Sequence, residues 1–137
     1  MAIAVHIVGS AGRHADVTPS GELVVGSPAF STPYTAEVNG TAITNIVTPK
    51  TNNCFVITAI IIGQDRTNTD SKVNIYESNS VDGTASREIL TIDVAKSQVV
   101  PLTGLNMTTE KNKWINFTSD SGTSTIRVTI MGYYTSA

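Results

Sequence analysis

The side chains most able to do acid–base or nucleophilic chemistry are few in this chain of 137 residues. The histidines are His6 and His14, and the one cysteine is Cys54. A serine-type catalytic system needs a histidine base on a rigid scaffold beside its nucleophile. Both histidines lie in a region broken by proline and glycine, and Cys54 lies within the most hydrophobic run. We therefore predict no catalytic residue, and we expect Cys54 to pack as a small core side chain.

Metal, nucleotide and sugar-cleaving sites are not predicted either. One cysteine and two histidines cannot supply the ligand set of a zinc site. Asp65, Asn68 and Asp70 could offer oxygens to calcium, but their spacing is not that of an EF-hand loop. The glycine-containing turn at residues 9–12 lacks the lysine of a phosphate-binding loop, and the scattered carboxylates do not single out a glycosidase pair. We predict no metal and no cofactor.

Charge and length restrict the class of protein. The net charge is −2, the pI is about 5.5, and charged residues make up 15% of the chain. Nucleic-acid binding needs a dense Lys/Arg surface, so it is not expected. The stretch MAIAVHIVGSAG has no leading positive charge and is too short to span a membrane, so we expect neither a signal peptide nor membrane contact. The length suits one domain with its own core.

The strongest structural signal is the run NCFVITAIIIG at residues 53–63. Its alternating positions give two apolar faces, one with Phe55, Ile57, Ala59 and Ile61, the other with Cys54, Val56, Ile60 and Ile62. A β-branched run that is apolar on both faces is typical of a strand buried on both sides. We therefore expect this strand at the centre of a sheet that packs against another layer.

Further strand patterns follow at about 8–12 residue spacing. They cover residues 35–38, 41–48, 72–78, 87–94, 98–103, 113–118 and 125–134. Asn39-Gly40 predicts a tight hairpin between the first two of these segments, and the turn at 119–122 predicts another between the last two. Pro101 predicts that 98–103 is an edge strand or ends early. The fold class expected is all-β, an antiparallel β-sandwich resembling a jelly roll, with an extended N-terminal arm.

The arm is predicted at residues 1–34 and the β-sandwich domain at 35–137. The first segment contains Pro19, Pro28 and Pro33 together with several glycines, a density that breaks regular structure. Only residues 2–8 and 22–25 have strand-like patterns there. We expect the arm to lie on the body or on a neighbouring subunit.

Several phrases resemble one group of proteins. They are GRHADVTPSGELVV at 12–25, CFVITAII at 54–61, VNIYES at 73–78, PLTGLN at 101–106 and IRVTIMGYY at 126–134. Together they resemble small β-sandwich structural proteins of tailed bacteriophage virions, of the capsid decoration (cement) type. The resemblance implies a non-enzymatic homotrimer on the capsid surface that stabilises the head by binding between subunits of the major capsid protein.

The expected contact residues are mainly apolar side chains of the arm and of the last strand. They are Ile3, Val5, Ile7, Arg13, His14, Leu23, Val24, Phe30, Tyr133 and Tyr134. Two alternatives remain open: a tail, baseplate or fibre component, and a glycan-binding β-sandwich module. In the second alternative Trp114 could serve as a stacking platform for sugars.

Overall fold

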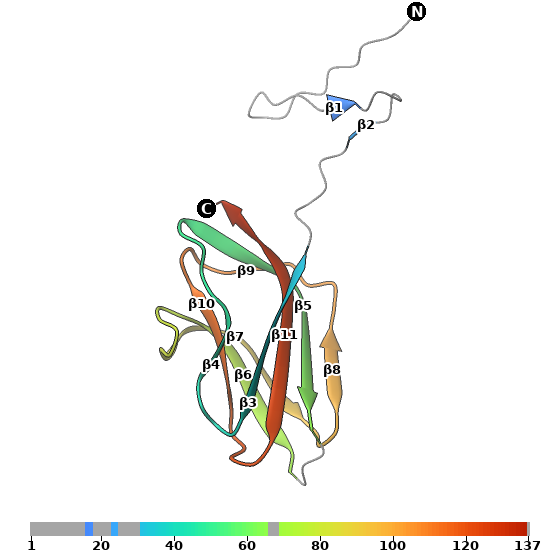
Figure 1. Ribbon diagram of the computed structural model, residues 1–137, viewed down its shortest axis with the longest axis vertical. Helices are drawn as coiled ribbons and strands as arrows, with labels where there is room; N and C mark the ends of the chain where they lie inside the picture. Colours follow the sequence, from blue (N-terminus) through green and yellow to red (C-terminus); the bar gives the residue numbers. More distant parts are fainter. Residues whose placement is uncertain (1–15, 18–22, 25–30, 66–68, 137) are drawn as a thin grey trace, which may run out of the picture.

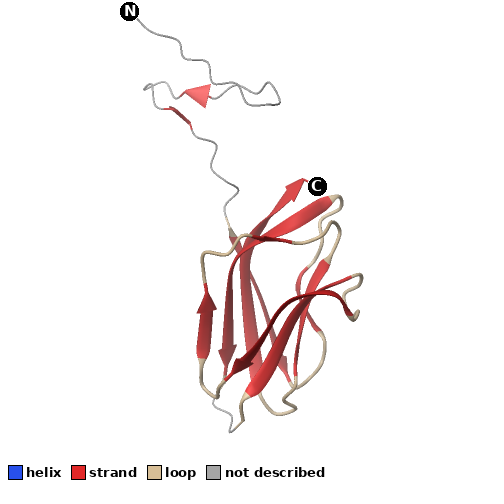
Figure 2. Cartoon of the chain, turned by 180° about the vertical axis from the view of Figure 1, so that it is seen from behind, coloured by secondary structure: helices blue, strands red, loops and turns tan. Residues whose placement is uncertain are grey.

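A computed structural model describes residues 16–17, 23–24, 31–65 and 69–136. These residues form eleven β-strands and no helix (Figures 1 and 2). The strands are β1 Asp16–Val17, β2 Leu23–Val24, β3 Thr32–Asn39, β4 Thr44–Val47, β5 Asn53–Gln64, β6 Ser71–Ser78, β7 Ala85–Val94, β8 Val99–Leu102, β9 Met107–Thr108, β10 Trp114–Ser119 and β11 Thr125–Ser136.

Two antiparallel sheets pack face to face and confirm the predicted β-sandwich (Figure 1). The first sheet has the strand order β3-β11-β5-β8, with β9 also paired to β5, and the second has the order β4-β10-β6-β7. Strand β8, which contains Pro101, lies at an edge as predicted. β1 and β2 form a separate antiparallel pair. Most of the predicted arm lies outside the described residues, and β3 begins at Thr32, inside the range assigned to the arm.

Both predicted hairpins are wrong. β3 and β4 belong to different sheets, and so do β10 and β11. A type I′ turn needs positive φ at both central residues, but only Gly40 has it, with φ +106°. The Gly40 amide donates to the carbonyl of Ser124 at 3.1 Å, so the two connections between the sheets lie side by side. The turn residues were recognised correctly, but the chain uses them to cross between layers.

The run at residues 53–63 forms β5, the inner strand between β11 and β8. Its alternation is interrupted by a bulge, because Met131 pairs with Ala59 whereas Gly132 pairs with Ile57. Thr58 is therefore the extra residue, and its hydroxyl donates to the Met131 carbonyl at 3.1 Å. A bulge on one strand shifts the phase of the side chains that follow it. The predicted faces were thus wrong beyond Thr58.

The core lies between the sheets and consists mainly of β-branched aliphatic side chains. From β5 it receives Phe55, Ile57, Ile60 and Ile62. The other strands add Val38, Ile46, Val47, Val73, Ile75, Val94, Ile115, Phe117, Ile126, Val128 and Ile130. Val56, Ala59 and Ile61 are not part of this cluster, so β5 also has an apolar side that faces away from the second sheet.

Candidate functional site

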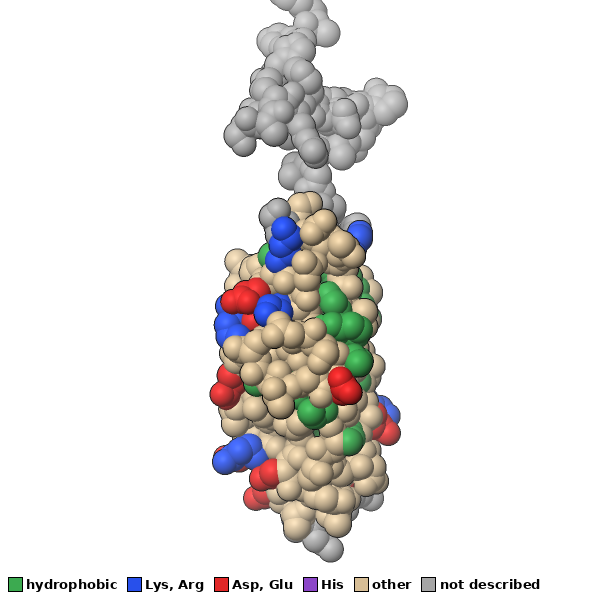
Figure 3. Space-filling view, turned by 90° about the vertical axis from the view of Figure 1, so that its left-hand side faces the viewer, with side chains coloured by type: hydrophobic (Ala, Val, Ile, Leu, Met, Phe, Trp, Pro, Cys, Tyr) green, Lys and Arg blue, Asp and Glu red, His purple; other side chains and the backbone are tan. Residues whose placement is uncertain are grey.

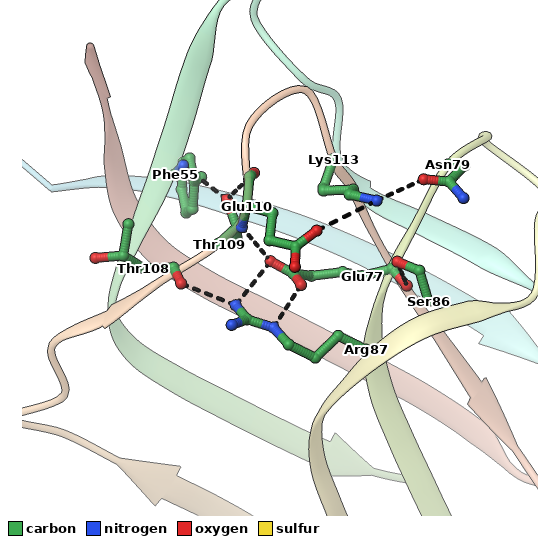
Figure 4. A network of polar contacts seen from close by, with 9 residues as sticks. All are labelled: Phe55, Glu77, Asn79, Ser86, Arg87, Thr108, Thr109, Glu110 and Lys113. Carbon is green, nitrogen blue, oxygen red and sulfur yellow. Dashed lines mark hydrogen bonds and ion pairs between the residues drawn. The ribbon is translucent and has the colours of Figure 1, made fainter. Parts of the chain in front are cut away.

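The most deeply buried charged group of the described residues is the Glu77 carboxylate on β6, which is 0% exposed. Arg87 on β7 binds it with two hydrogen bonds, Nε to Oε2 at 2.6 Å and Nη2 to Oε1 at 2.9 Å. Oε1 also accepts the backbone N–H of Glu110 at 2.7 Å. Arg87 Nη2 donates in addition to the carbonyl of Thr108 at 2.9 Å (Figure 4).

This cluster joins the two sheets. Glu77 and Arg87 lie on the second sheet, whereas Thr108 belongs to β9, which pairs with β5 of the first sheet. The next residue, Thr109, accepts the Phe55 amide on its hydroxyl at 2.8 Å. Because fixed donors occupy both carboxylate oxygens, Glu77 is held as a structural acceptor. We interpret the cluster as a clamp between the sheets.

Sequence reasoning did not single out Glu77, although a signal was present. The alternation of β6 places Val73 and Ile75 on the inward side, and Glu77 is next in that series. A buried charge needs a partner, and Arg87 stands directly opposite Glu77 in the β6–β7 register. Only the register shows this pairing, because ten positions of sequence and a loop separate the two residues.

A second candidate is the outer face, defined as the side of the β3-β11-β5-β8 sheet that points away from the second sheet. Its cross-strand rows follow from the register. The first row is Glu37, Arg127, Gly63 and Val99, and the second is Thr35, Thr129, Ile61 and Pro101. A third row holds Pro33, Met131 and Ala59, and beyond the bulge Tyr133 stands opposite Val56. The outer face is thus charged at one end and apolar at the other.

The outer face is unusually apolar along β5. Val56 and Ala59 are only 6% and 8% exposed although they lie outside the inter-sheet core. Beside them Ile61 is half-buried, and Val99 at the sheet edge is 62% exposed. Figure 3 looks at the body from the side on which β4 lies in Figure 1, and the hydrophobic band that it shows therefore belongs to that side rather than to β8. An antiparallel sheet that faces water normally carries polar residues on that side.

The exposed side of the second sheet has the polarity that the outer face lacks. Lys72 stands opposite Asp93 across β6 and β7, and both are exposed. The amide of Asn45 donates to the Oδ1 atom of Asn116 at 3.0 Å. The two sides of the sandwich therefore differ along these strands, and Val99 and Pro101 give the outer face exposed apolar side chains.

A groove of about 360 Å³ lies in the charged end of the outer face. It forms because Gly63 has no side chain between Arg127 and Val99, its cross-strand neighbours. Glu37 and Arg127 make an ion pair in its wall, in which Nε and Nη2 approach Oε2 at 3.0 Å and 2.6 Å. Their side chains are 47% and 65% exposed, so this ion pair remains accessible to a partner.

The predicted contact residues fall into three groups. Ile3, Val5, Ile7, Arg13, His14 and Phe30 lie outside the described residues, and for Leu23 and Val24 only the strand is described. Tyr133 is half-buried on the outer face beside Val56. Tyr134 points to the other side, where its ring packs edge-on against Phe55 with ring centroids 5.2 Å apart. Of the predicted contact residues, Tyr133 alone is described on the outer face.

Tyr134 is bound within its own chain. Its hydroxyl donates to the carbonyl of Thr48 at 2.5 Å, and its ring also contacts Tyr34. Burial, and secondarily the neighbouring Tyr34, raise the pKa of Tyr134 above its ordinary value of 10.0. Because the folded pKa is the higher one, the unfolded chain loses this proton first. The stabilisation of the folded state by the protonated Tyr134 is therefore complete below about pH 10. It is lost as the pH rises through the folded pKa of Tyr134.

We expect Tyr134→Phe to lower the free energy of unfolding by about 1 kcal/mol near neutral pH, through the lost hydrogen bond to Thr48. The variant should also lose part of the decline in stability at alkaline pH, because no proton is released at that position. Urea unfolding at about pH 8 and about pH 11 measures both effects. If the stability of the variant fell at alkaline pH as much as that of the wild type, the decline would have to come from other groups.

Cys54 is half-buried and is not part of the core cluster, so the predicted core position is wrong.

Within the described ranges no three His, Cys, Asp or Glu side chains gather as metal ligands would. The same ranges contain no helix with the length and apolar character required to cross a membrane.

No protein-family model matches the sequence, and no curated protein matches it. Among solved structures, the chain is similar to one in the cyanophage Pam1 capsid asymmetric unit, with a TM-score of 0.43 and 15% identity over 79% of this chain and 89% of that chain. A Clostridium thermocellum xylanase 10B structure with CBM22-1 and GH10 modules and xylohexaose has a TM-score of 0.39 and 13% identity, over 75% of this chain and 24% of that chain. Hydroquinone 1,2-dioxygenase from Sphingomonas sp. TTNP3 has a TM-score of 0.33 and 12% identity, over 82% of this chain and 64% of that chain. Likenesses at these scores establish neither a family nor a function for this chain.

Proposed function

We propose that this protein is a non-enzymatic structural subunit of a tailed bacteriophage virion. The observation that carries the proposal is apolar surface on the outer face, where Val99 is 62% exposed and Pro101 is exposed beside the half-buried Ile61. Apolar surface of this kind is typical of faces that another protein covers. A subunit that functions by being packed against neighbours needs such a face and a rigid body behind it. The core and the Glu77 clamp provide that body.

Within this class we propose a trimeric capsid decoration protein. It would bind the major capsid protein and copies of itself at the capsid surface and stabilise the head between capsid subunits. The support is the resemblance of the phrases at 12–25, 54–61 and 126–134 to such proteins. We also propose that the sandwich is a jelly roll. Apart from the short β9, every step between consecutive strands of the body crosses between the sheets except β6 to β7, as in a double-sheet roll.

The proposal also concerns what the protein does not bind. With a net charge of −2 and few basic residues, the chain lacks the dense positive surface that nucleic acid requires. The groove beside Gly63 is lined by both signs of charge, from Glu37 and Arg127. We propose protein surfaces as the partners, without nucleic acid or membrane.

The test is quantitative mass spectrometry of purified virions of the phage that encodes the chain. A copy number near that of the major capsid protein supports a decoration protein. A ratio in the low per cent range would instead indicate a tail, baseplate or fibre component. Absence from virions contradicts the proposal, and quenching of Trp114 fluorescence by sugars would then favour the glycan-binding alternative.

A further inference from the structure

We infer that the outer face of the β3-β11-β5-β8 sheet is the surface through which copies of this chain contact one another, with Glu37 and Arg127 as the charges that pair between copies. The inference rests on the proposed function, which requires a self-associating subunit. To the proposed function it adds which surface makes the contact between copies and which residues pair across it. It is carried by three features of the described residues: apolar side chains, a neutral ion pair and a sheet side that contrasts with them.

The first feature is apolar surface that the chain itself leaves uncovered. Val99 is 62% exposed although it lies on a strand that pairs with the inner strand β5, and it stands opposite Gly63 on this face. Pro101 is also exposed and stands directly opposite Ile61. Interfaces between like subunits are more apolar than the remaining protein surface. These side chains are the ones that a second copy would remove from water.

The second feature is the charge balance of this face. Glu37 and Arg127 are adjacent, opposite in sign and both largely exposed. Arg127 uses only the Oε2 atom of Glu37, and within the described residues Oε1 accepts no hydrogen bond. Such a pair offers little to a strongly acidic or strongly basic partner. Around a three-fold axis, the arginine of each copy can lie opposite the glutamate of the next copy.

The third feature is the contrast with the other side of the sandwich. That side also carries an exposed pair of opposite charges, Lys72 and Asp93, but these stand among polar neighbours such as Asn74 and Thr91. Charge balance is therefore common to both sides, and the exposed Val99 in the same cross-strand row distinguishes the pair on the outer face. This makes Lys72 and Asp93 a matched control.

The experiment uses charge reversal and charge exchange in the full chain. Glu37→Arg carries two positive charges on the outer face, and Arg127→Glu carries two negative ones. Each variant alone should self-associate about 100-fold more weakly than the wild type, because like charges then oppose each other. The double variant, with Glu37→Arg and Arg127→Glu in one chain, should regain association, because each copy again offers one charge of each sign to its neighbours. Sedimentation velocity over a range of concentrations measures all three samples.

The controls separate charge pairing from folding. Lys72→Glu and Asp93→Lys change charge by the same amount on the opposite side and should leave association unchanged. Thermal unfolding, measured at concentrations at which the wild type is monomeric, should be nearly the same for all these variants, because every mutated side chain is exposed. A folded variant that fails to associate then reports the loss of a contact between copies.

Three outcomes would overturn the inference. They are a wild-type protein that stays monomeric, reversed variants that associate as the wild type does, and a folded double variant that does not regain association. Binding of the same samples to capsids without this protein separates the two proposals. Reversed variants that keep their oligomeric state but lose capsid binding would assign the outer face to the capsid. Charge-dependent association of a protein that is absent from virions would contradict the proposed function alone.

Discussion

Arg87→Ala is expected to lower the free energy of unfolding by about 3–5 kcal/mol, because it leaves the buried Glu77 carboxylate without its cationic partner. Glu77 is 0% exposed, and Arg87 supplies two of the three hydrogen bonds that its side chain accepts. The remaining donor is the Glu110 amide. The substitution should also loosen the segment at residues 107–110, because the Thr108 carbonyl loses the hydrogen bond that Arg87 donates.

The chain contains a matched control for this prediction. Arg127 and Glu37 are also directly opposite on neighbouring strands and also form a two-bond ion pair. They differ in exposure chiefly at the acid, because Glu37 is 47% exposed and Glu77 is fully buried, whereas the arginines are 65% and 49% exposed. At concentrations at which the chain is monomeric, Arg127→Ala should therefore cost no more than about 1 kcal/mol, as exposed ion pairs do.

Urea unfolding followed by the fluorescence of the single tryptophan, Trp114, compares the two variants. The expected result is a large shift of the midpoint for Arg87→Ala and a small one for Arg127→Ala. Equal shifts would mean that burial does not distinguish the two ion pairs, and the clamp between the sheets would lose its support. Amide exchange that rises at 107–110 in Arg87→Ala only would place the effect at the predicted contact.

Gly132→Ala is expected to be the second most damaging single change, with a loss of about 3 kcal/mol or more. A Cβ atom at Gly132 would lie 2.1 Å from the carbonyl oxygen of Val56 and 2.5 Å from the ring of Phe55. The first of these atoms is backbone of the inner strand β5, so it cannot turn aside as a flexible side chain would. Strand β11 would have to move away from β5 next to the Thr58 bulge.

Gly63→Ala is the control, because it makes the same chemical change on the neighbouring strand of the same sheet. Its Cβ would meet the nearest atom, Cγ2 of Val99, at 4.0 Å, which is ordinary van der Waals contact. We expect a change within about 0.5 kcal/mol. Thermal unfolding of both variants tests the pair of predictions. A Gly132→Ala protein as stable as Gly63→Ala would show that the bulge can relax around an added methyl group.

The strands could be predicted from sequence because alternation of side chains is a local property. Ile126, Val128 and Ile130 alternate with Arg127 and Thr129, and β11 places the first three in the core. Pro101 likewise predicted an edge strand, because a residue without an N–H cannot pair on both sides. In both cases the deciding information lies within a few residues of chain.

The pairing of strands could not be predicted in the same way. Asn39-Gly40 has the composition of a hairpin turn, but β3 and β4 lie in different sheets. A turn dipeptide determines the backbone angles of two residues, and whether the flanking strands pair depends on the faces that the whole sheet must bury. The Thr58 bulge is similar, since it depends on the close approach of Gly132 from a strand more than seventy positions later.

The candidate site shows the same division. Sequence alone determined that β5 has apolar side chains on both faces, that charged groups are sparse and that the fold is all-β. Only the tertiary structure decided that a second sheet covers one of these faces and that the other forms the outer face. It also brought Glu37 beside Arg127 and buried Glu77 against Arg87. The physical reason is that composition and alternation are written into each segment, whereas coverage and pairing depend on which distant strands the fold places side by side.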